Sequence, residues 1–241
     1  MQPIRINLWS SPRNISTAMM YSFAQRKDTM VFDEPLYAHY LKTTGIVHPG
    51  NEEILQSQNN DGEKVIGEII LASHNKPLVF FKQMTHHLKN ISLDFLSQTK
   101  NIIFIRNPRQ IIASYAQVIK NVTMENVGIK KQWWLFNYLK ERSMDCVVLD
   151  SNEILQSPQN VMQQLCAALQ IPFDENMLHW PAGPKPYDGV WAKYWYNNVH
   201  LSTGFSKQKS SERELPSHLE PLHEACKVYY EQLYPYSIKA L

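Results

Sequence analysis

The chain has 241 residues, of which 44% are hydrophobic and 19% are charged, so it can bury the core of one large domain. Its 24 basic and 22 acidic residues give a net charge of +2, a balance that gives no reason to expect nucleic acid as a partner. Cys146, Cys166 and Cys226 are far apart in apolar runs, which argues against a disulfide framework and predicts free thiols. Neither the cysteines nor the histidines show the spacing of metal ligands, so we expect no metal site.

The first residues, MQPIRINLW, lack the long apolar stretch of a secretion signal, and no run of the chain reaches the length of a membrane span. We therefore expect a cytoplasmic protein with no membrane span. Neither a repeat nor a linker interrupts the chain, so we expect one domain over residues 1–241. Its core would cover about residues 4–178, and an aromatic loop and a helix would cover 179–241. The sequence indicates no oligomeric state.

Short β-rich runs alternate with helical segments along the core. We expect strands at 4–9, 29–32, 77–82, 101–106 and 145–150. We expect helices at 17–26, 51–58, 62–72, 86–97, 110–120, 128–142, 158–169 and 216–233, with the rest of 36–60 irregular and with Ser157 as the N-cap before Pro158. This order predicts an α/β fold with three αβα layers and a central, mostly parallel sheet. Ligands of such sheets bind beyond the carboxyl ends of the strands.

Residues 10–17, SSPRNIST, join the first expected strand to the first expected helix. Backbone amides at a helix N-terminus attract anions, and Arg13 can hold two phosphate oxygens while Ser16 and Thr17 donate hydroxyl hydrogen bonds. The turn therefore predicts a phosphate site. An ordinary capped helix with an exposed arginine is the alternative.

Residues 106–114, RNPRQIIAS, form a second candidate phosphate site. Arg106 ends the strand at 101–106, Asn107-Pro108 breaks the chain, and a new helix carries Ser114 back toward the same edge of the sheet. The alternative is a solvated arginine beside an unrelated serine. If both segments bind phosphate, we expect Arg13 and Arg106 to converge on one crevice.

Together these segments resemble the sulfotransferase family, which uses 3′-phosphoadenosine-5′-phosphosulfate (PAPS) as its sulfuryl donor. The family's Pro-Lys/Arg-Ser-Gly-Ser/Thr-Thr turn holds the 5′-phosphosulfate and its Arg-x7-Ser segment holds the 3′-phosphate; here these positions read PRNIST and RNPRQIIAS. A third family feature, a strand followed by an acidic turn, a proline and a helix, is similar to residues 147–173. The resemblance covers about residues 4–178 and implies a P-loop-type fold and a PAPS-dependent transferase. The donor-binding residues that it implies are Arg13, Asn14, Ile15, Ser16, Thr17, Arg106 and Ser114.

The chain departs from the family pattern at two places. Ile15 stands where the family has a glycine, so either its side chain points into the core in a different loop geometry or donor binding is weaker. The family's C-terminal Arg-Lys-Gly-x-x-Gly-Asp-Trp segment is absent. Residues 200–207, HLSTGFSK, are the candidate replacement, with Ser202, Thr203, Gly204 and Lys207 as the residues that would contact the donor.

Sulfuryl transfer requires a base for the acceptor and stabilisation of the leaving phosphate. Asp33 and Glu34 follow the second expected strand, and the resemblance to related branches implies that Glu34 is the base. Lys82, in FFKQMTHH, is expected to stabilise the transferring group together with Arg13, and His86 or His87 are alternative bases. A structural role, as a capping or salt-bridged carboxylate, is the alternative for Glu34.

Two other functions compete with this interpretation. A P-loop nucleotide kinase would use Asp150 to hold magnesium, but the GxxxxGK[ST] loop is missing. A non-catalytic nucleotide-binding relative is favoured by Ile15 and by the missing C-terminal segment. The acceptor would be a hydroxyl or an amine of a small molecule, a glycan or a lipid, and the sequence does not distinguish these.

Overall fold

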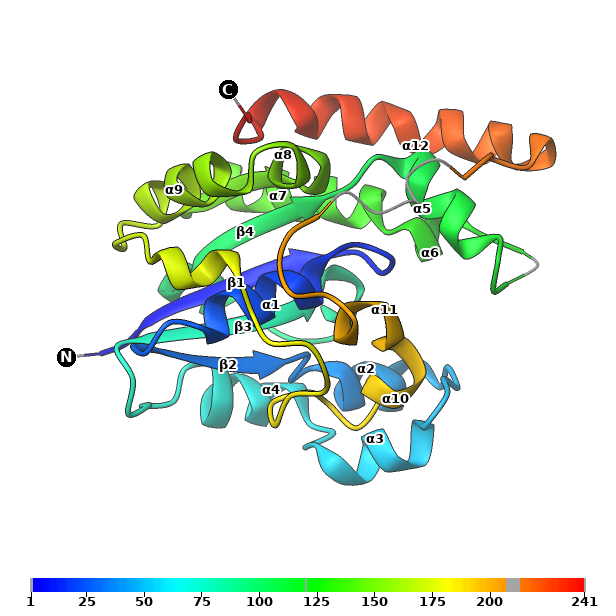
Figure 1. Cartoon of the computed structure of the whole chain (residues 1–241). Coiled ribbons are helices and arrows are strands. Elements are labelled where there is room, and N and C mark those ends of the chain that lie inside the picture. The colour runs from blue at the N-terminus through cyan, green and yellow to red at the C-terminus, as the bar shows by residue number, and fades with distance from the viewer. Residues whose placement is uncertain (1, 120, 207–212, 241) are drawn as a thin grey trace. The chain divides into compact units, whose positions relative to one another are not determined.

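A computed structural model describes residues 2–119, 121–206 and 213–240. Within these residues, five strands form a parallel sheet in the order β2-β3-β1-β4-β5, flanked by helices (Figure 1). The strands are β1 (Ile4–Ser10), β2 (Thr29–Asp33), β3 (Leu78–Met84), β4 (Lys100–Ile105) and β5 (Cys146–Asp150). The prediction of an αβα fold around a mostly parallel sheet is confirmed.

Helices connect the strands throughout the described residues. The α-helices are α1 (Ser16–Ala24), α2 (Tyr37–Thr44), α3 (Asn51–Ser57), α4 (Gly62–Val65), α5 (Pro108–Tyr115), α6 (Met124–Val127), α7 (Ile129–Glu141), α8 (Ser151–Gln156), α9 (Pro158–Ala168), α10 (Ala192–Trp195), α11 (Asn197–His200) and α12 (Glu220–Leu233). A π-helix over Ile66–Ile70 continues α4, and 3₁₀ turns cover Thr85–His87, Asp94–Gln98, Glu175–Leu178, Ser217–Leu219 and Tyr234–Tyr236. No helix among the described residues is both long and apolar enough to cross a membrane.

Two local predictions are wrong and a third is confirmed in position only. The helix expected at 86–97 is replaced by two separate 3₁₀ turns, and Asn90 between them has a left-handed backbone (φ 50°) that an α-helix does not accommodate. The segment 36–60, expected to be irregular outside 51–58, contains α2, whose inner face buries Tyr37, Ala38 and Leu41. Ser157 is the N-cap residue of α9 before Pro158, as expected, but its side chain makes no capping hydrogen bond.

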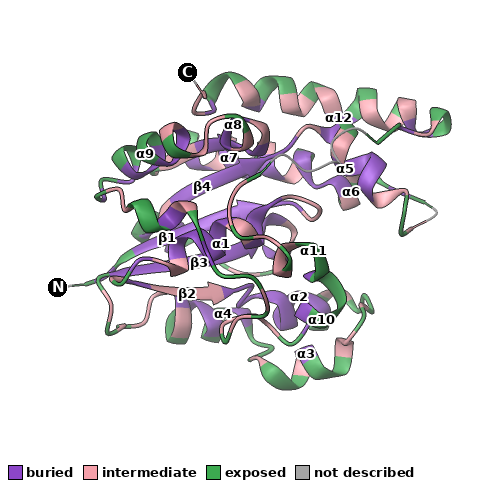
Figure 2. Ribbon diagram, in the orientation of Figure 1, coloured by how far each residue is buried: buried purple, intermediate pink, exposed green. Residues whose placement is uncertain are grey.

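The chain divides into two compact units. Unit 1 comprises Met1–Leu8, Ser16–Asn101 and Asp174–Gly204; unit 2 comprises Trp9–Ile15, Ile102–Phe173 and Phe205–Leu241. Figure 2 shows β3 and β4 buried along nearly their whole length, as their unbroken apolar sequences predict for strands covered on both faces. The expectation of a single domain stays a prediction.

Each unit has an apolar interior of its own. In unit 1, Trp191 and Tyr196 from the aromatic segment over 180–200 join a cluster with Tyr37, Leu41 and Ile54. In unit 2, α12 packs against α7, where the rings of Trp133 and Tyr229 lie 5.7 Å apart. Three of the six aromatic residues in this segment, Trp180, Trp191 and Tyr196, are buried, whereas Tyr194 and Trp195 are exposed. Two short helices, α10 and α11, interrupt the predicted loop.

Candidate functional site

The side chain of Asn14 holds the turn after β1 in place through two hydrogen bonds. Asn14 Nδ2 donates to the carbonyl of Phe104 at 3.0 Å, and Asn14 Oδ1 accepts from the backbone N–H of Ile15 at 2.8 Å. Gln132 on α7 also connects the end of β1 to the end of β4, because its Nε2 donates to the carbonyls of Trp9 and Phe104. These amide side chains hold the turn at the end of β4.

Arg13 and Arg106 meet within unit 2. Arg106 Nη1 donates to the carbonyl of Arg13 at 2.7 Å, and Arg13 Nε donates to Ser114 Oγ at 3.0 Å. Asn107 caps α5 by accepting from the Arg109 N–H, and Pro108 occupies the first turn, so the helix begins where it brings Ser114 to Arg13. The structure therefore brings Arg13 and Arg106 together, whereas a crevice that binds phosphate between them stays a prediction.

The guanidinium groups of Arg13 and Arg106 bring two positive charges together beside Ser114. Burial and the neighbouring Arg13 charge lower the pKa of Arg106 to about 10, and burial also lowers the pKa of Arg13, so both remain protonated at neutral pH. Neither forms an ion pair with any residue in 2–119, 121–206 or 213–240. Two partly desolvated guanidinium groups and a hydroxyl at one point favour binding of an anion such as phosphate.

Ile15 does not occupy the strained position of the turn. Its side chain is buried, and the left-handed backbone conformation lies at Arg13 instead, with φ 59°. Of the two alternatives for this departure from the family pattern, the structure supports the one that places Ile15 in the core. Ser16 and Thr17 follow it as the first residues of α1, and both are buried.

Replacing Ile15 by the family's glycine should therefore destabilise the protein without improving ligand binding. Losing a buried isoleucine side chain is expected to lower the free energy of unfolding by about 2–5 kcal/mol in urea denaturation. Ile15→Val, which removes one methylene, should cost only about 0.5–1.5 kcal/mol. An Ile15→Gly variant of unchanged stability that bound 3′-phosphoadenosine-5′-phosphate (PAP) more tightly would contradict this interpretation.

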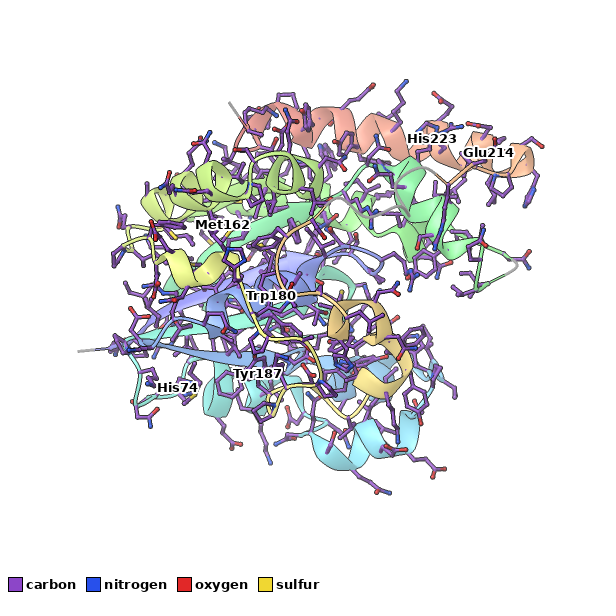
Figure 3. The ribbon with its side chains drawn as sticks, viewed as in Figure 1. His74, Met162, Trp180, Tyr187, Glu214 and His223 are labelled. Carbon is purple, nitrogen blue, oxygen red and sulfur yellow. The ribbon has the colours of Figure 1, made fainter. Side chains whose placement is uncertain are left out.

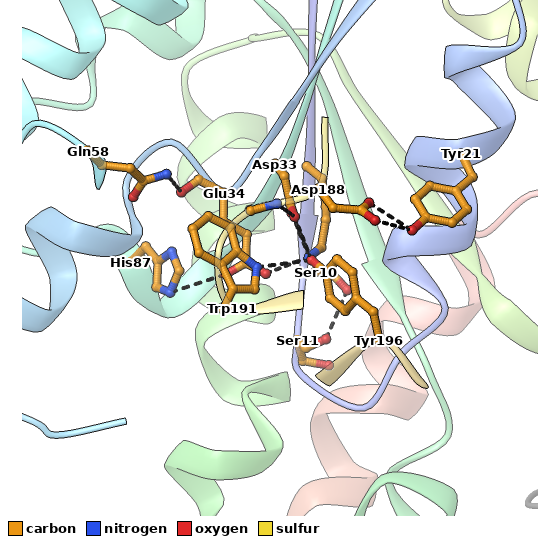
Figure 4. Close-up of polar contacts among 12 residues, drawn as sticks. Ser10, Ser11, Tyr21, Asp33, Glu34, Gln58, His87, Asp188, Trp191 and Tyr196 are labelled. Carbon is orange, nitrogen blue, oxygen red and sulfur yellow. Dashed lines mark hydrogen bonds and ion pairs between the residues drawn. The ribbon is translucent and has the colours of Figure 1, made fainter. Parts of the chain in front are cut away.

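A buried ionic cluster occupies the carboxyl ends of β2 and β3 in unit 1 (Figure 4). Asp33 and Lys82 are paired in register, and Lys82 Nζ donates to Asp33 Oδ1 at 2.9 Å, Glu34 Oε1 at 2.5 Å and Tyr196 Oη at 2.5 Å. Burial would lower the pKa of Lys82, but the carboxylates of Asp33 and Glu34 outweigh it and hold that pKa well above its ordinary value. All three ammonium hydrogens are thus engaged within the protein, which makes Lys82 a residue that positions Glu34.

Hydrogen bonds hold the backbone and one carboxylate oxygen of Glu34. Its N–H donates to the Lys82 carbonyl at 2.8 Å, and its carbonyl accepts from Gln58 Nε2 at 3.1 Å. Lys82 occupies Oε1, whereas Oε2 has no hydrogen-bond partner among the described residues and lies 3.8 Å from His87 Nε2. Burial raises the pKa of Glu34; the positive charge of Lys82 opposes this and the negative charge of Asp33 adds to it. A fixed carboxylate with raised pKa and one free oxygen has the properties of a general base.

The two histidines after β3 are poorer proton acceptors. Burial lowers the pKa of His86 to about 3 and holds the pKa of His87 well below its ordinary value. The His87 ring is stacked between Tyr37 and Tyr40, with centroid distances of 5.0 and 4.8 Å. A lowered pKa makes each imidazole a weak proton acceptor, which counts against either as the base.

The sequence provides little indication of the groups that complete this cluster. Tyr196, between α10 and α11, donates to Asp33 Oδ2 at 2.7 Å and accepts from Trp191 Nε1 at 3.1 Å. The backbone N–H of Gly189 donates to Asp33 Oδ2 at 3.0 Å. The high density of aromatic residues over 180–200 is the one feature of the sequence that indicated this segment as a possible part of the site.

Nearby in the same segment, Asp188 accepts hydrogen bonds from the Tyr21 hydroxyl at 2.7 and 2.9 Å. The edges of Trp180 and Tyr187, both labelled in Figure 3, pack around the Tyr21 ring at 6.4 and 5.8 Å. Asp188 therefore anchors the aromatic segment to α1.

The candidate C-terminal donor site is occupied by contacts within unit 1. Gly204 forms an antiparallel bridge with His179, the carbonyl of Thr203 accepts from the Trp180 N–H, and Ser202 Oγ accepts from Trp180 Nε1. Lys207 lies outside the described residues. A donor-binding role for Thr203 and Gly204 stays a prediction.

One group of potential metal ligands occurs among the described residues, and the sequence did not indicate it. Glu220, His223 and Glu224 lie together on α12 (His223 is labelled in Figure 3). Arg109 Nη1 is 3.0 Å from Glu220 Oε1, so a cation of the protein already pairs with this carboxylate.

Comparison with known proteins identifies similar chains. The family model described as "Sulfotransferase domain" matches residues 4–232. Branched-chain-amino-acid aminotransferase-like proteins 1 and 2 of Arabidopsis thaliana are 40% and 37% identical, each over 95% of this chain but only 41% of their own length. The chain thus spans less than half of these curated relatives.

Solved structures share the fold at low sequence identity. The sulfotransferase domain from the curacin biosynthetic pathway covers 96% of this chain and 98% of its own, with a TM-score of 0.55 and 15% identity. Mouse sulfotransferase SULT7A1, in a structure complexed with PAP, covers 98% of this chain and 91% of its own, with a TM-score of 0.52 and 11% identity. At these identities the likeness concerns the fold alone.

Proposed function

Because the chain belongs to the sulfotransferase family, we propose that it transfers a sulfuryl group from PAPS to a hydroxyl or an amine of an acceptor. The observation that carries this proposal is the pairing of Arg13 with Arg106 beside Ser114, without a carboxylate counter-ion among the described residues. Charge-assisted hydrogen bonds from arginine are well suited to phosphate. The PAP in the structure of mouse SULT7A1 supports a donor of this type.

The proposed roles follow from the contacts that each residue makes. Arg106 and Ser114 bind the 3′-phosphate of the donor, while Arg13 and the turn formed by Asn14, Ile15, Ser16 and Thr17 bind its 5′ end. Glu34 Oε2 accepts the proton of the acceptor as the acceptor atom bonds to sulfur and the bond from sulfur to the phosphate oxygen breaks. Lys82 holds Glu34 in place, because no ammonium hydrogen is left for the transferring group.

The kinase alternative is disfavoured by the contacts of Asp150. Its carboxylate caps α8 by accepting from the backbone N–H groups of Asn152 and Glu153, and Tyr230 donates to its other oxygen at 3.0 Å. Burial raises the pKa of Asp150, and a carboxyl group occupied in this way is a poor magnesium ligand. A non-catalytic relative stays the alternative against which activity is tested.

Isothermal titration calorimetry of the wild-type protein distinguishes these functions. PAP is expected to bind without magnesium, and ATP is expected to bind weakly with or without it. Magnesium-dependent binding of ATP, with no binding of PAP, would overturn the proposal in favour of a kinase. The acceptor class (a small molecule, a glycan or a lipid), a cytoplasmic location and the absence of a nucleic-acid partner are part of the proposal.

A further inference from the structure

Two carboxylates share a single buried ammonium group in unit 1. Asp33 and Glu34 are 7% and 6% exposed, and Lys82, at 1%, is within hydrogen-bond distance of both. Two negative charges against one positive charge is an unfavourable balance away from water. One of the two carboxylates is therefore predisposed to take up a proton.

The hydrogen bonds to the two carboxylates are unequal. Asp33 accepts from Lys82 Nζ, from the Tyr196 hydroxyl and from the Gly189 N–H. Glu34 accepts from Lys82 alone, and its Oε2 has no donor among the residues that the structure describes. Donors stabilise the charged form of a carboxyl group, so Glu34, which accepts fewer hydrogen bonds, is the carboxylate that takes up the proton.

We propose that Asp33 is a positioning residue that keeps Glu34 basic, and that hydrogen bonds from Gly189 and Tyr196 hold the Asp33 carboxylate in place beside Lys82 and Glu34. This inference rests on the proposed function, in which Glu34 is the base. It assigns a role to the aromatic segment over 180–200, because that segment supplies both of these donors.

The other groups that face Glu34 do not carry charge near neutral pH. His87, from the 3₁₀ turn after β3, is neutral because burial lowers its pKa, and Tyr196 is neutral because burial and Asp33 raise its pKa. Gln58 is uncharged, and its hydrogen bond to Glu34 goes to the backbone carbonyl and not to the carboxylate. Two charges therefore act on the pKa of Glu34 in opposite directions: the positive charge of Lys82 lowers it and the negative charge of Asp33 raises it.

The test is an NMR titration of the Glu34 carboxyl carbon in protein labelled with ¹³C-glutamate, with the signal assigned by its loss in Glu34→Gln. In Asp33→Asn the midpoint of the Glu34 titration is expected to fall by about one pH unit or more, because the like charge is gone and Lys82 pairs with Glu34 alone. Asp33→Ser, whose smaller side chain admits water beside Lys82, provides the same test if Asp33→Asn does not fold.

Asp188→Asn is the matched control. The Asp188 side chain is 5% exposed and anchors the same segment through Tyr21 and His200, but it makes no contact with Glu34. It is expected to leave the Glu34 midpoint in place. An unchanged midpoint in Asp33→Asn, or an equal fall in Asp188→Asn, would overturn the inference.

A second measurement separates this inference from the proposed function. The pH profile of PAPS hydrolysis, with water as acceptor, should have an acidic limb that moves with the Glu34 midpoint in Asp33→Asn. A fall in the NMR midpoint with an unmoved acidic limb would overturn the role of Asp33 in catalysis. If the midpoint falls but wild-type protein turns over no PAPS and binds no PAP, the proposed function fails while the coupling of Asp33 to Glu34 stands.

Discussion

Arg106→Ala is expected to bind PAP about 10- to 150-fold more weakly than the wild type, because losing a charge-assisted hydrogen bond costs about 1.5–3 kcal/mol. Arg106 is 6% exposed, so truncation also removes the hydrogen bond that supports the Arg13 carbonyl. Calorimetry with PAP measures the effect directly. Arg106→Lys should recover only part of the affinity, since an ammonium group cannot hold two phosphate oxygens in the fork geometry of a guanidinium group.

Arg109→Ala is the matched control for this prediction. Arg109 is three positions away on α5, but its side chain is 47% exposed and pairs with Glu220. Its loss is expected to change PAP affinity less than two-fold. Equal weakening in Arg106→Ala and Arg109→Ala would mean that PAP responds to the general positive charge of the surface, and a specific 3′-phosphate site at Arg106 would be ruled out.

Glu34→Gln is expected to reduce sulfuryl transfer about 100- to 10,000-fold, the usual contribution of a general base, while PAP affinity stays within two-fold of the wild type. The substitution keeps the shape of the side chain and an oxygen for Lys82, so the protein should remain folded. Turnover of PAPS and calorimetry with PAP separate the two effects. Glu68→Gln, at an exposed position on the π-helix, should behave as the wild type.

The same variant has an expected signature in stability. Because the folded-state pKa of Glu34 is raised, its contribution to the free energy of unfolding is present below the ordinary glutamate range and is lost as pH rises through the raised value. Glu34→Gln does not titrate, so its stability relative to the wild type should increase as pH rises through that range. Urea denaturation at several pH values measures the free energy of unfolding of both proteins. If the value for Glu34→Gln minus that for the wild type fell with rising pH, a raised pKa at Glu34 would be contradicted.

Local features of the sequence predicted much of the fold and which strand ends carry the candidate site. Unbroken apolar runs such as 77–82 predict buried parallel strands because covered strands have no polar face. The approach of Arg13 to Arg106 could also be predicted, since Arg13 lies three residues after the end of β1, Arg106 follows β4 directly, and parallel strands end at the same edge of the sheet.

Other features depend on residues that are distant in sequence. The left-handed backbone lies at Arg13 and not at Ile15, because Asn14 ties the turn to Phe104, ninety positions away. No spacing rule connects Tyr196 with Asp33, 163 positions earlier, or with Lys82, 114 positions earlier. These contacts form only when the aromatic segment packs on the ends of β2 and β3.

By itself, the sequence determined the α/β class, the strand order along the chain and the presence of an arginine near the ends of two strands, since each depends on local hydrophobic pattern and on residues next to strand ends. Tertiary structure alone decided which carboxylate is saturated with donors and which keeps a free oxygen. The physical reason is that hydrogen-bond donors and desolvation at Asp33 and Glu34 come from distant segments, and these set the balance of charge in a buried site.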